Sequence, residues 1–212
     1  MKSYVAAFML SIAIAGPAWA DAVDDRVLGL QQSWDHISYE MPANARPAAM
    51  AQLDARARTV VSQSPGRAEP LVWAAIIFAS EAGLKGGLSA LSLVKDAKAF
   101  LERAEAINGR VLDGSVYTTL GSLYAQVPGA PLAFGDHAKA RSYLQRALTV
   151  NPTGIDPNFY MGDLLFRDHD YAGAVRYLQR AIAAPARPGR SAADAGRRAE
   201  ARALLAKAQS HL

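Results

Sequence analysis

The sequence predicts an all-α protein built from stacked pairs of antiparallel helices. The first observation behind this prediction is a two-helix pattern that occurs twice between residues 115 and 185. The second is that apolar residues recur every three or four positions between clusters of proline and glycine, which is the spacing of amphipathic helices. The third is a set of small residues at matched positions of the two copies, which would allow close helix packing.

The repeated pattern runs in the same order in both copies, with glycine, alanine, leucine and proline at corresponding places. The first copy consists of Tyr117, Leu120, Gly121, Tyr124, Ala140, Leu144, Ala147 and Pro152. The second copy consists of Asn158, Met161, Gly162, Leu165, Ala174, Leu178, Ala181 and Pro185. A glycine inside a helix costs about 0.5–1 kcal/mol relative to alanine, so a compensating contact is expected there. We therefore predict that Gly121 and Gly162 lie against the second helix of their pair, at Ala140 and Ala174.

This order resembles the tetratricopeptide repeat, whose signature is W-x₂-L-G-x₂-Y, then A-x₃-F, then P. The resemblance is to exported bacterial members, and it implies a right-handed α-solenoid of about three to four helical hairpins with a C-terminal capping helix. Two unrelated amphipathic helices with incidental glycines are the alternative. The agreement of four spaced positions in both copies disfavours that alternative.

Residues 1–20 have the features of a secretory signal peptide. Lys2 precedes an apolar run over residues 4–15, then Gly16-Pro17, and the segment ends in Ala18-Trp19-Ala20. We predict cleavage after Ala20, which leaves a repeat domain over residues 21–212 in the bacterial periplasm. An uncleaved anchor is the alternative, although the apolar run is short for a membrane span. The chain contains no cysteine, which excludes a cysteine-linked lipid anchor, disulfides and thiol chemistry.

Two helix pairs are predicted before the repeats. Helices over residues 24–39 and 47–63 form a degenerate first hairpin. Pro70 opens the next helix, which is apolar nearly all round and is therefore expected to be buried. In the long helix that follows, Ala97, Leu101 and Ala104 have the same spacing as Ala140, Leu144 and Ala147 in the first copy, which marks a third, divergent copy.

The connection over residues 127–136 is about seven residues longer than a 34-residue repeat allows. We expect Asp136 to cap the following helix and Phe134 and Leu132 to pack the loop onto the core. The alternative is that this loop lines a binding site, because insertions in helical repeats often lie on the binding face.

Several polar residues are expected to have structural roles. Asp156 and Asp170 are predicted N-caps, and Ser191 with Asp194 has capping-box spacing at the start of a last helix over residues 191–210. The basic side of that helix is expected to face solvent, with an acidic partner or a membrane surface as the alternative. It consists of Arg187, Arg190, Arg197, Arg198, Arg202 and Lys207.

No motif in the sequence predicts catalysis, a cofactor or a metal site. The segment 168–170 reads Asp-His-Asp, but one tight turn rarely supplies enough oriented metal ligands. The histidines show no ligand spacing, and nucleophile and nucleotide-binding motifs are missing. Without the signal peptide, 22 basic residues against 19 acidic ones give a net charge of +3, which is too small to indicate nucleic-acid binding.

The resemblance implies a non-catalytic interaction or assembly scaffold that binds a protein or peptide in a concave groove. The first helix of each hairpin would line this groove with Asp156, Phe159, Asp163, Phe166, Ser115, Thr118, Ser122, Ala125, Leu71, Ala74, Phe78 and Glu81. Phe159 and Phe166 are the expected aromatic anchors. The lysine and asparagine cluster with which some family members bind a C-terminal carboxylate is missing, so free carboxylates are not expected ligands. The alternative function is a small-molecule-binding accessory subunit of a solute transport system, as in family members associated with tripartite transporters.

Overall fold

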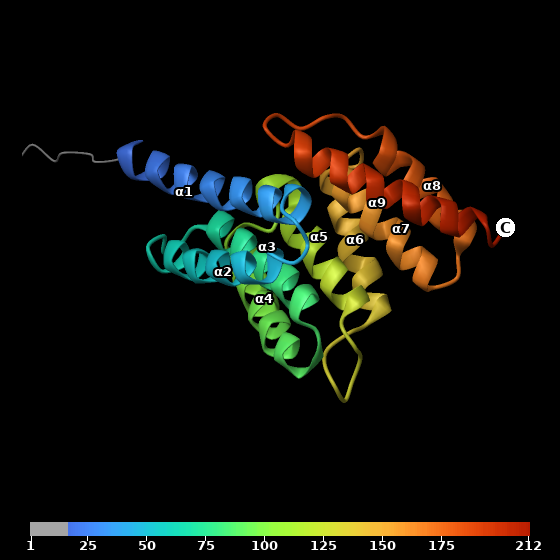
Figure 1. The fold of residues 1–212 in the computed structure, drawn as a ribbon, viewed down its shortest axis with the longest axis horizontal. Helices are drawn as coiled ribbons and strands as arrows, with labels where there is room; N and C mark the ends of the chain where they lie inside the picture. The colour runs from blue at the N-terminus through green and yellow to red at the C-terminus, as the bar shows by residue number, and fades with distance from the viewer. Residues whose placement is uncertain (1–16) are drawn as a thin grey trace, which may run out of the picture.

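The computed structural model describes residues 17–212, and this part of the chain consists of helices and their connections without any strand (Figure 1). The helices are α1 (Pro17–Asp35), α2 (Arg46–Ser62), α3 (Ala68–Lys85), α4 (Gly87–Asn108), α5 (Val111–Gln126), α6 (His137–Val150), α7 (Ile155–Arg167), α8 (Tyr171–Ala183) and α9 (Ser191–Gln209). A π-helical turn, η1 (His36–Glu40), continues α1. The predicted signal peptide lies outside the described residues except for residues 17–20, which begin α1.

The helices pack as successive hairpins. The pairs α3/α4, α5/α6 and α7/α8 lie side by side, and each hairpin contacts the next (Figure 1). The first helices also contact one another in chain order, from α1 to α3, α5, α7 and α9. They therefore form an inner row, and α2, α4, α6 and α8 form the outer row. This arrangement confirms the predicted all-α stack of helix pairs.

The two repeat glycines lie where a larger residue would not fit. A Cβ atom on Gly121 would be 2.6 Å from Leu144 Cγ and 3.2 Å from the Ala140 carbonyl oxygen. A Cβ atom on Gly162 would be 2.8 Å from Leu178 Cγ. The distances to the two leucine Cγ atoms are too short for a real Cβ atom, so the glycines allow the close approach that the sequence predicts.

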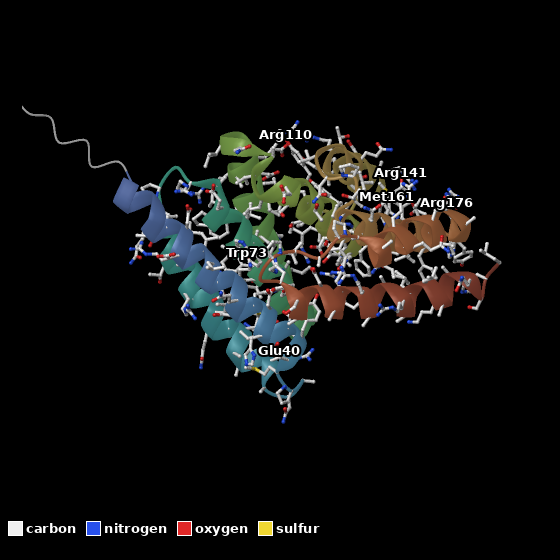
Figure 2. All side chains as sticks on the ribbon, turned by 90° about the horizontal axis from the view of Figure 1, so that it is seen from above. Glu40, Trp73, Arg110, Arg141, Met161 and Arg176 are labelled. Carbon is white, nitrogen blue, oxygen red and sulfur yellow. The ribbon has the colours of Figure 1, made fainter. Side chains whose placement is uncertain are left out.

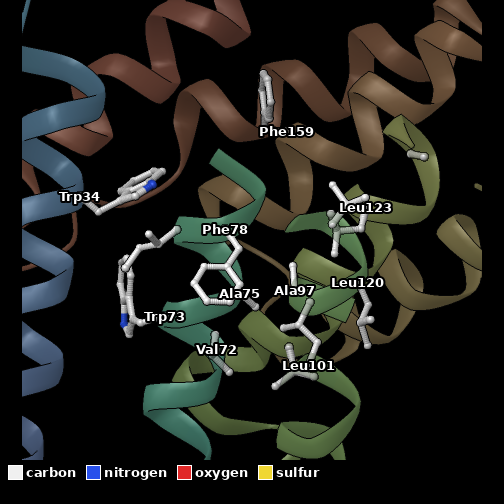
Figure 3. Close-up of a cluster of buried hydrophobic side chains, with 14 of the residues drawn as sticks. Trp34, Val72, Trp73, Ala75, Phe78, Ala97, Leu101, Leu120, Leu123 and Phe159 are labelled. Carbon is white, nitrogen blue, oxygen red and sulfur yellow. The ribbon is translucent and has the colours of Figure 1, made fainter. Parts of the chain in front are cut away.

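The predicted packing residues form most of the core around these contacts. The buried ones are Leu120, Tyr124, Ala140, Leu144, Ala147, Met161, Leu165, Ala174, Leu178 and Ala181. Tyr117 is half-buried, and Pro152 is exposed. Helix α3 is buried on both sides as predicted, and Figure 3 shows its Val72, Ala75 and Phe78 among the buried side chains.

Two predicted helix starts are wrong. Gly154, not Asp156, is the N-cap of α7, because the Asp156 side chain is bound by arginines from elsewhere. Arg190, not Ser191, is the N-cap of α9, and the Asp194 carboxylate accepts hydrogen bonds from Arg187 instead of completing a capping box.

The last helix returns to the first. α9 packs on α7 and α8 and also contacts η1. Arg190 Nε lies 2.8 Å from an Asp35 carboxylate oxygen, and the Tyr39 ring lies against Gly196. Figure 2 shows Glu40, at the end of η1, beside the beginning of α9. The inner row is therefore closed into a ring. None of the helices between residues 17 and 212 has an apolar stretch long enough to span a bilayer.

Candidate binding cavity

A partly open cavity of about 900 Å³ lies among the inner helices and the beginning of α4. Its wall is formed by side chains of α1, η1, α3, α4, α5 and α7 together with residues 185–197. Cavities of about 300–1,000 Å³ are typical of small-molecule and cofactor sites. The cavity is therefore the candidate functional site of the described chain.

A stripe of hydroxyl groups on α5 forms one wall. Ser115, Thr118, Thr119 and Ser122 line the cavity because they fall on one face of the helix at helical spacing. The Ser115 hydroxyl donates to the Leu112 carbonyl at 2.6 Å, and those of Thr118 and Thr119 also donate to α5 carbonyls. The Ser122 hydroxyl makes no hydrogen bond within residues 17–212. This wall contains three of the predicted groove residues.

An aromatic wall lies where α1 meets α3. Trp34 and Trp73 lie beside each other (Figure 3), and their rings contact edge to face at a centroid distance of 6.1 Å. The Tyr39 ring contacts Trp34 at a centroid distance of 5.7 Å. Trp34 Nε1 donates to Ser80 Oγ at 2.8 Å, which fixes the orientation of the indole. All three aromatic residues line the cavity.

Asp156 lies at the centre of an ion cluster in the cavity wall. Arg187 donates to one of its oxygens at 2.7 Å, and Arg197 donates to the other at 2.9 Å. Burial raises the pKa of Asp156, but Arg197 and Arg187 outweigh this effect, so the pKa lies below its usual value. Both guanidinium groups have further partners within the protein, which are Asp194, Glu200 and Tyr160.

Arg190 is bound differently from these two arginines. Its guanidinium carbon lies 5.3 Å from the centre of the Trp73 ring, and its Nε faces Asp35 without hydrogen-bond geometry. Neither terminal nitrogen of Arg190 makes a hydrogen bond in the described part of the chain. Burial raises the pKa of Asp35, and the nearby Arg190 opposes this shift.

A left-handed turn at the start of α5 adds an acidic group to the cavity. Leu112, Asp113 and Gly114 have positive φ angles of 50°, 54° and 78°. Positive φ is unfavourable for residues with a side chain, and such strain is concentrated at functional sites. Leu112 and Asp113 both line the cavity.

The remaining predicted groove residues do not line the cavity. Phe159 is buried beneath Arg197, and Phe166 packs edge to face on Tyr171 at 5.5 Å. Asp163 accepts a hydrogen bond from Arg167 at 2.9 Å. The other predicted groove residues are buried because neighbouring helices cover α3 and α5. They are Leu71, Ala74, Phe78, Glu81 and Ala125. Whether the two phenylalanines act as binding anchors stays a prediction.

The loop over residues 127–136 has both structural and cavity contacts. Asp136 caps α6 by accepting a hydrogen bond from the Lys139 backbone at 3.0 Å, as predicted. Phe134 packs edge to face on Tyr124 at 5.4 Å. The expected packing of Leu132 is wrong, because this side chain is 66% exposed at the loop tip. Val127 and Pro128 reach the cavity wall.

The short turn between α7 and α8 is occupied by protein contacts. Asp170 caps α8 as predicted, by accepting a hydrogen bond from the Gly173 backbone at 2.8 Å. Asp168 binds Arg141 at 2.6 Å and also contacts His137.

The arginines are the site residues that sequence reasoning missed. Arg187, Arg190 and Arg197 were expected on a solvated face, but they line the cavity and are largely buried. This expectation is wrong because the segment before α9 folds back over the open side of the inner row. An available signal was the Pro-x-x-Pro-Gly-Arg sequence over residues 185–190, which places two arginines in a turn beside the predicted groove.

Comparison with known proteins gives little further information. No protein family and no curated protein matches the sequence. A solved structure described as "Functional Characterization of Pseudomonas Aeruginosa pilF" aligns with 91% of this chain and 90% of its own, at 17% identity and a TM-score of 0.37. A likeness at that score carries no functional argument.

Proposed function

We propose that the protein is a non-catalytic binding module of the bacterial periplasm that holds a segment of a protein partner in the central cavity. The observation that carries this proposal is the position of the cavity. It lies on the concave side of the inner row, between α3, α5 and α7, where Ser115, Thr118, Ser122 and Asp156 all reach its wall. A tetratricopeptide-like stack offers its partners this side, and such binding requires only a rigid wall.

The polar groups of the cavity favour binding over catalysis. A hydroxyl nucleophile needs a neighbouring base to accept its proton. The hydroxyl groups of Ser115, Thr118 and Thr119 instead donate their protons to backbone carbonyls of α5. A general acid or base needs a carboxyl group that can exchange its proton, but two arginines hold Asp156 in its charged form.

Site-specific photo-crosslinking in the native compartment tests this function. A photoreactive amino acid at Ser122, inside the cavity, should capture a partner that mass spectrometry identifies. The same amino acid at Arg176, which is exposed on the outer helix α8, is the matched control. Capture of the same proteins at both positions, or at Arg176 alone, would contradict the proposal. Recovery of a chain that begins at Asp21 would support export.

A small-molecule-binding accessory subunit is the second candidate. The closure of the inner row by residues 185–197 favours it, because a closed ring restricts the entry of a folded partner. Native mass spectrometry of the purified protein would reveal a retained small molecule. In that case Ser122 should give no protein adduct.

A further inference from the structure

We propose that the cavity binds a carboxylate carried on a flat apolar body, with the carboxylate on Arg190 and the body against Trp73 and Trp34. This inference rests on the proposed function, since it requires the cavity to be the binding site. It names a chemical class of ligand that the closed helical ring alone does not specify.

The terminal nitrogens of Arg190 are the free donors of the arginine cluster. In Arg187, Nε and both terminal nitrogens are within 2.7 Å of carboxylate oxygens of Asp156 or Asp194. In Arg197, the three nitrogens are bound to Asp156, Glu200 and Tyr160. The printed contact of Arg190 with Asp35 is made by Nε, and neither terminal nitrogen of Arg190 makes a hydrogen bond within residues 17–212.

The position of Arg190 suits a bound anion. Its side chain is only 13% exposed, and the residue lines the cavity, so a ligand there would meet a partly desolvated guanidinium group. The planar guanidinium group presents two parallel N–H donors that match the two oxygens of a carboxylate. Because the side chain of Arg190 is mostly buried, this charge-assisted pair would be stronger than one on the surface.

The neighbouring wall suits an apolar body. The Trp73 ring lies under Arg190 and packs on Trp34, and each of these largely buried indoles reaches the cavity with a small part of its surface. Ile76 and Ala79 extend the same wall with aliphatic groups. An aromatic or flat aliphatic group attached to the carboxylate would therefore bury its faces here, with aromatic contacts in edge or offset geometry.

This inference revises the sequence-based expectation that free carboxylates do not bind. That expectation depended on the absence of the lysine and asparagine cluster from the groove positions of the first helices. Arg190 reaches the cavity from the connection before α9, which those positions do not include. The carboxylate could belong to a free organic acid or to the C-terminus of a peptide, and the experiment separates these sources.

Isothermal titration calorimetry with matched probes tests the inference on the purified protein. The probes are indole-3-propanoate and its uncharged primary amide. A second pair is N-acetyl-Gly-Phe with a free C-terminal carboxylate and the same dipeptide with a C-terminal amide. The wild-type protein should bind the acid of at least one pair about tenfold or more tightly than its amide. Preference for the dipeptide acid would identify a peptide end as the source, and preference for indole-3-propanoate would identify a small acid.

Three variants assign the preference to Arg190. Arg190→Gln should bind acid and amide equally, because a neutral side chain cannot form the charge-assisted pair. Arg190→Lys keeps the positive charge beside Asp35 but loses the two parallel N–H donors. It should retain an intermediate preference for acid over amide, even if Arg190→Gln fails to fold. Arg176→Gln removes an exposed arginine and should behave as the wild type.

The outcomes separate this inference from the proposed function. Equal binding of acids and amides by the wild type would overturn the carboxylate site, and so would an unchanged preference in Arg190→Gln. Both results would leave the cavity as a binding site. If none of the probes binds, the inference is also overturned, and the crosslink at Ser122 decides the proposed function independently.

Discussion

The ring of Tyr39 occupies the space that a side chain at position 196 would need. A Cβ atom on Gly196 would lie 2.0 Å from Tyr39 Cδ1, so glycine is what allows α9 to approach η1. Burial, the largest influence, raises the pKa of Tyr39 well above its usual value, and the hydroxyl stays neutral at physiological pH. This contact, together with Asp35 and Arg190, closes the inner row around the cavity.

Gly196→Ala should therefore open the ring. We expect the added methyl group to push α9 from η1 and to lower the free energy of unfolding by about 1–3 kcal/mol. Because the chain has no native cysteine, spin labels at Glu40→Cys and Ala203→Cys can report the separation by pulsed electron resonance. The distance should increase in Gly196→Ala and stay unchanged in Ala195→Ser, an exposed position of the same helix. An unchanged distance in Gly196→Ala would refute the closure.

Gly121→Ala should destabilise the protein by about 1–3 kcal/mol, because Leu144 and the Ala140 carbonyl already occupy the space beside Gly121. Gly83→Ala is the matched control. Gly83 lies within α3, and no atom beyond its chain neighbours and the nearby helix backbone lies within 4 Å of the position of its Cβ. This substitution should stabilise the protein by about 0.4–1 kcal/mol through the lower entropy of the unfolded chain. Urea denaturation measures both effects, and equal effects would contradict the close-packing account.

Asp156→Asn should destabilise the protein by about 3 kcal/mol at pH 7, because it leaves two largely buried arginines without their shared carboxylate. The pKa of Asp156 is lower in the folded protein than in the unfolded chain, where it is about 3.9. Its contribution is therefore complete above the unfolded pKa and is lost as pH falls through the folded pKa. Urea denaturation between pH 7 and pH 3 should show a shallower acid loss in Asp156→Asn.

Asp163→Asn is the control for this pH dependence. Asp163 pairs with Arg167 one turn away on α7, and the arginine is 42% exposed. Such a pair contributes little, so the free energy of unfolding should change by about 0.5 kcal/mol or less. If Asp156→Asn behaves like Asp163→Asn, the ion cluster has no special role in stability.

Phe134→Ala should test the role of the long loop. The ring packs on Tyr124, which in turn stacks on Tyr143 at 5.8 Å, so its removal should cost about 1–2 kcal/mol. Leu132→Ala in the same loop should cost less than about 0.5 kcal/mol, because Leu132 is 66% exposed. Thermal unfolding followed by circular dichroism measures both. A loop that serves only binding would show no difference between the two variants.

The sequence could predict the helix pairs because their signals are local. Gly121 with Ala140 and Gly162 with Ala174 belong to a repeat whose two copies reinforce each other, and the structure has the close contacts that this repeat predicts. The Asp136 cap was also predictable, since a cap depends on the residues that immediately follow it.

The closure of the ring could not be predicted in this way. Asp35 and Arg190 lie near opposite ends of the chain, and no periodic pattern connects them. Arg197 is on a helix with several exposed basic residues, so its charge indicated a solvated face. Its burial depends on Asp156 and Tyr160 of α7, which Arg197 reaches only when α9 packs on that helix.

The contact between η1 and α9 has a consequence for how the molecule unfolds. In an open helical array each repeat depends only on its neighbours, and the terminal repeats can fray independently. Here the opening segment is held by the final one, so neither end is a free terminus of the stack. Loss of α9 would therefore remove one set of contacts that hold η1, beside those that α1 makes with α2 and α3, and the amide hydrogens of η1 should then exchange faster.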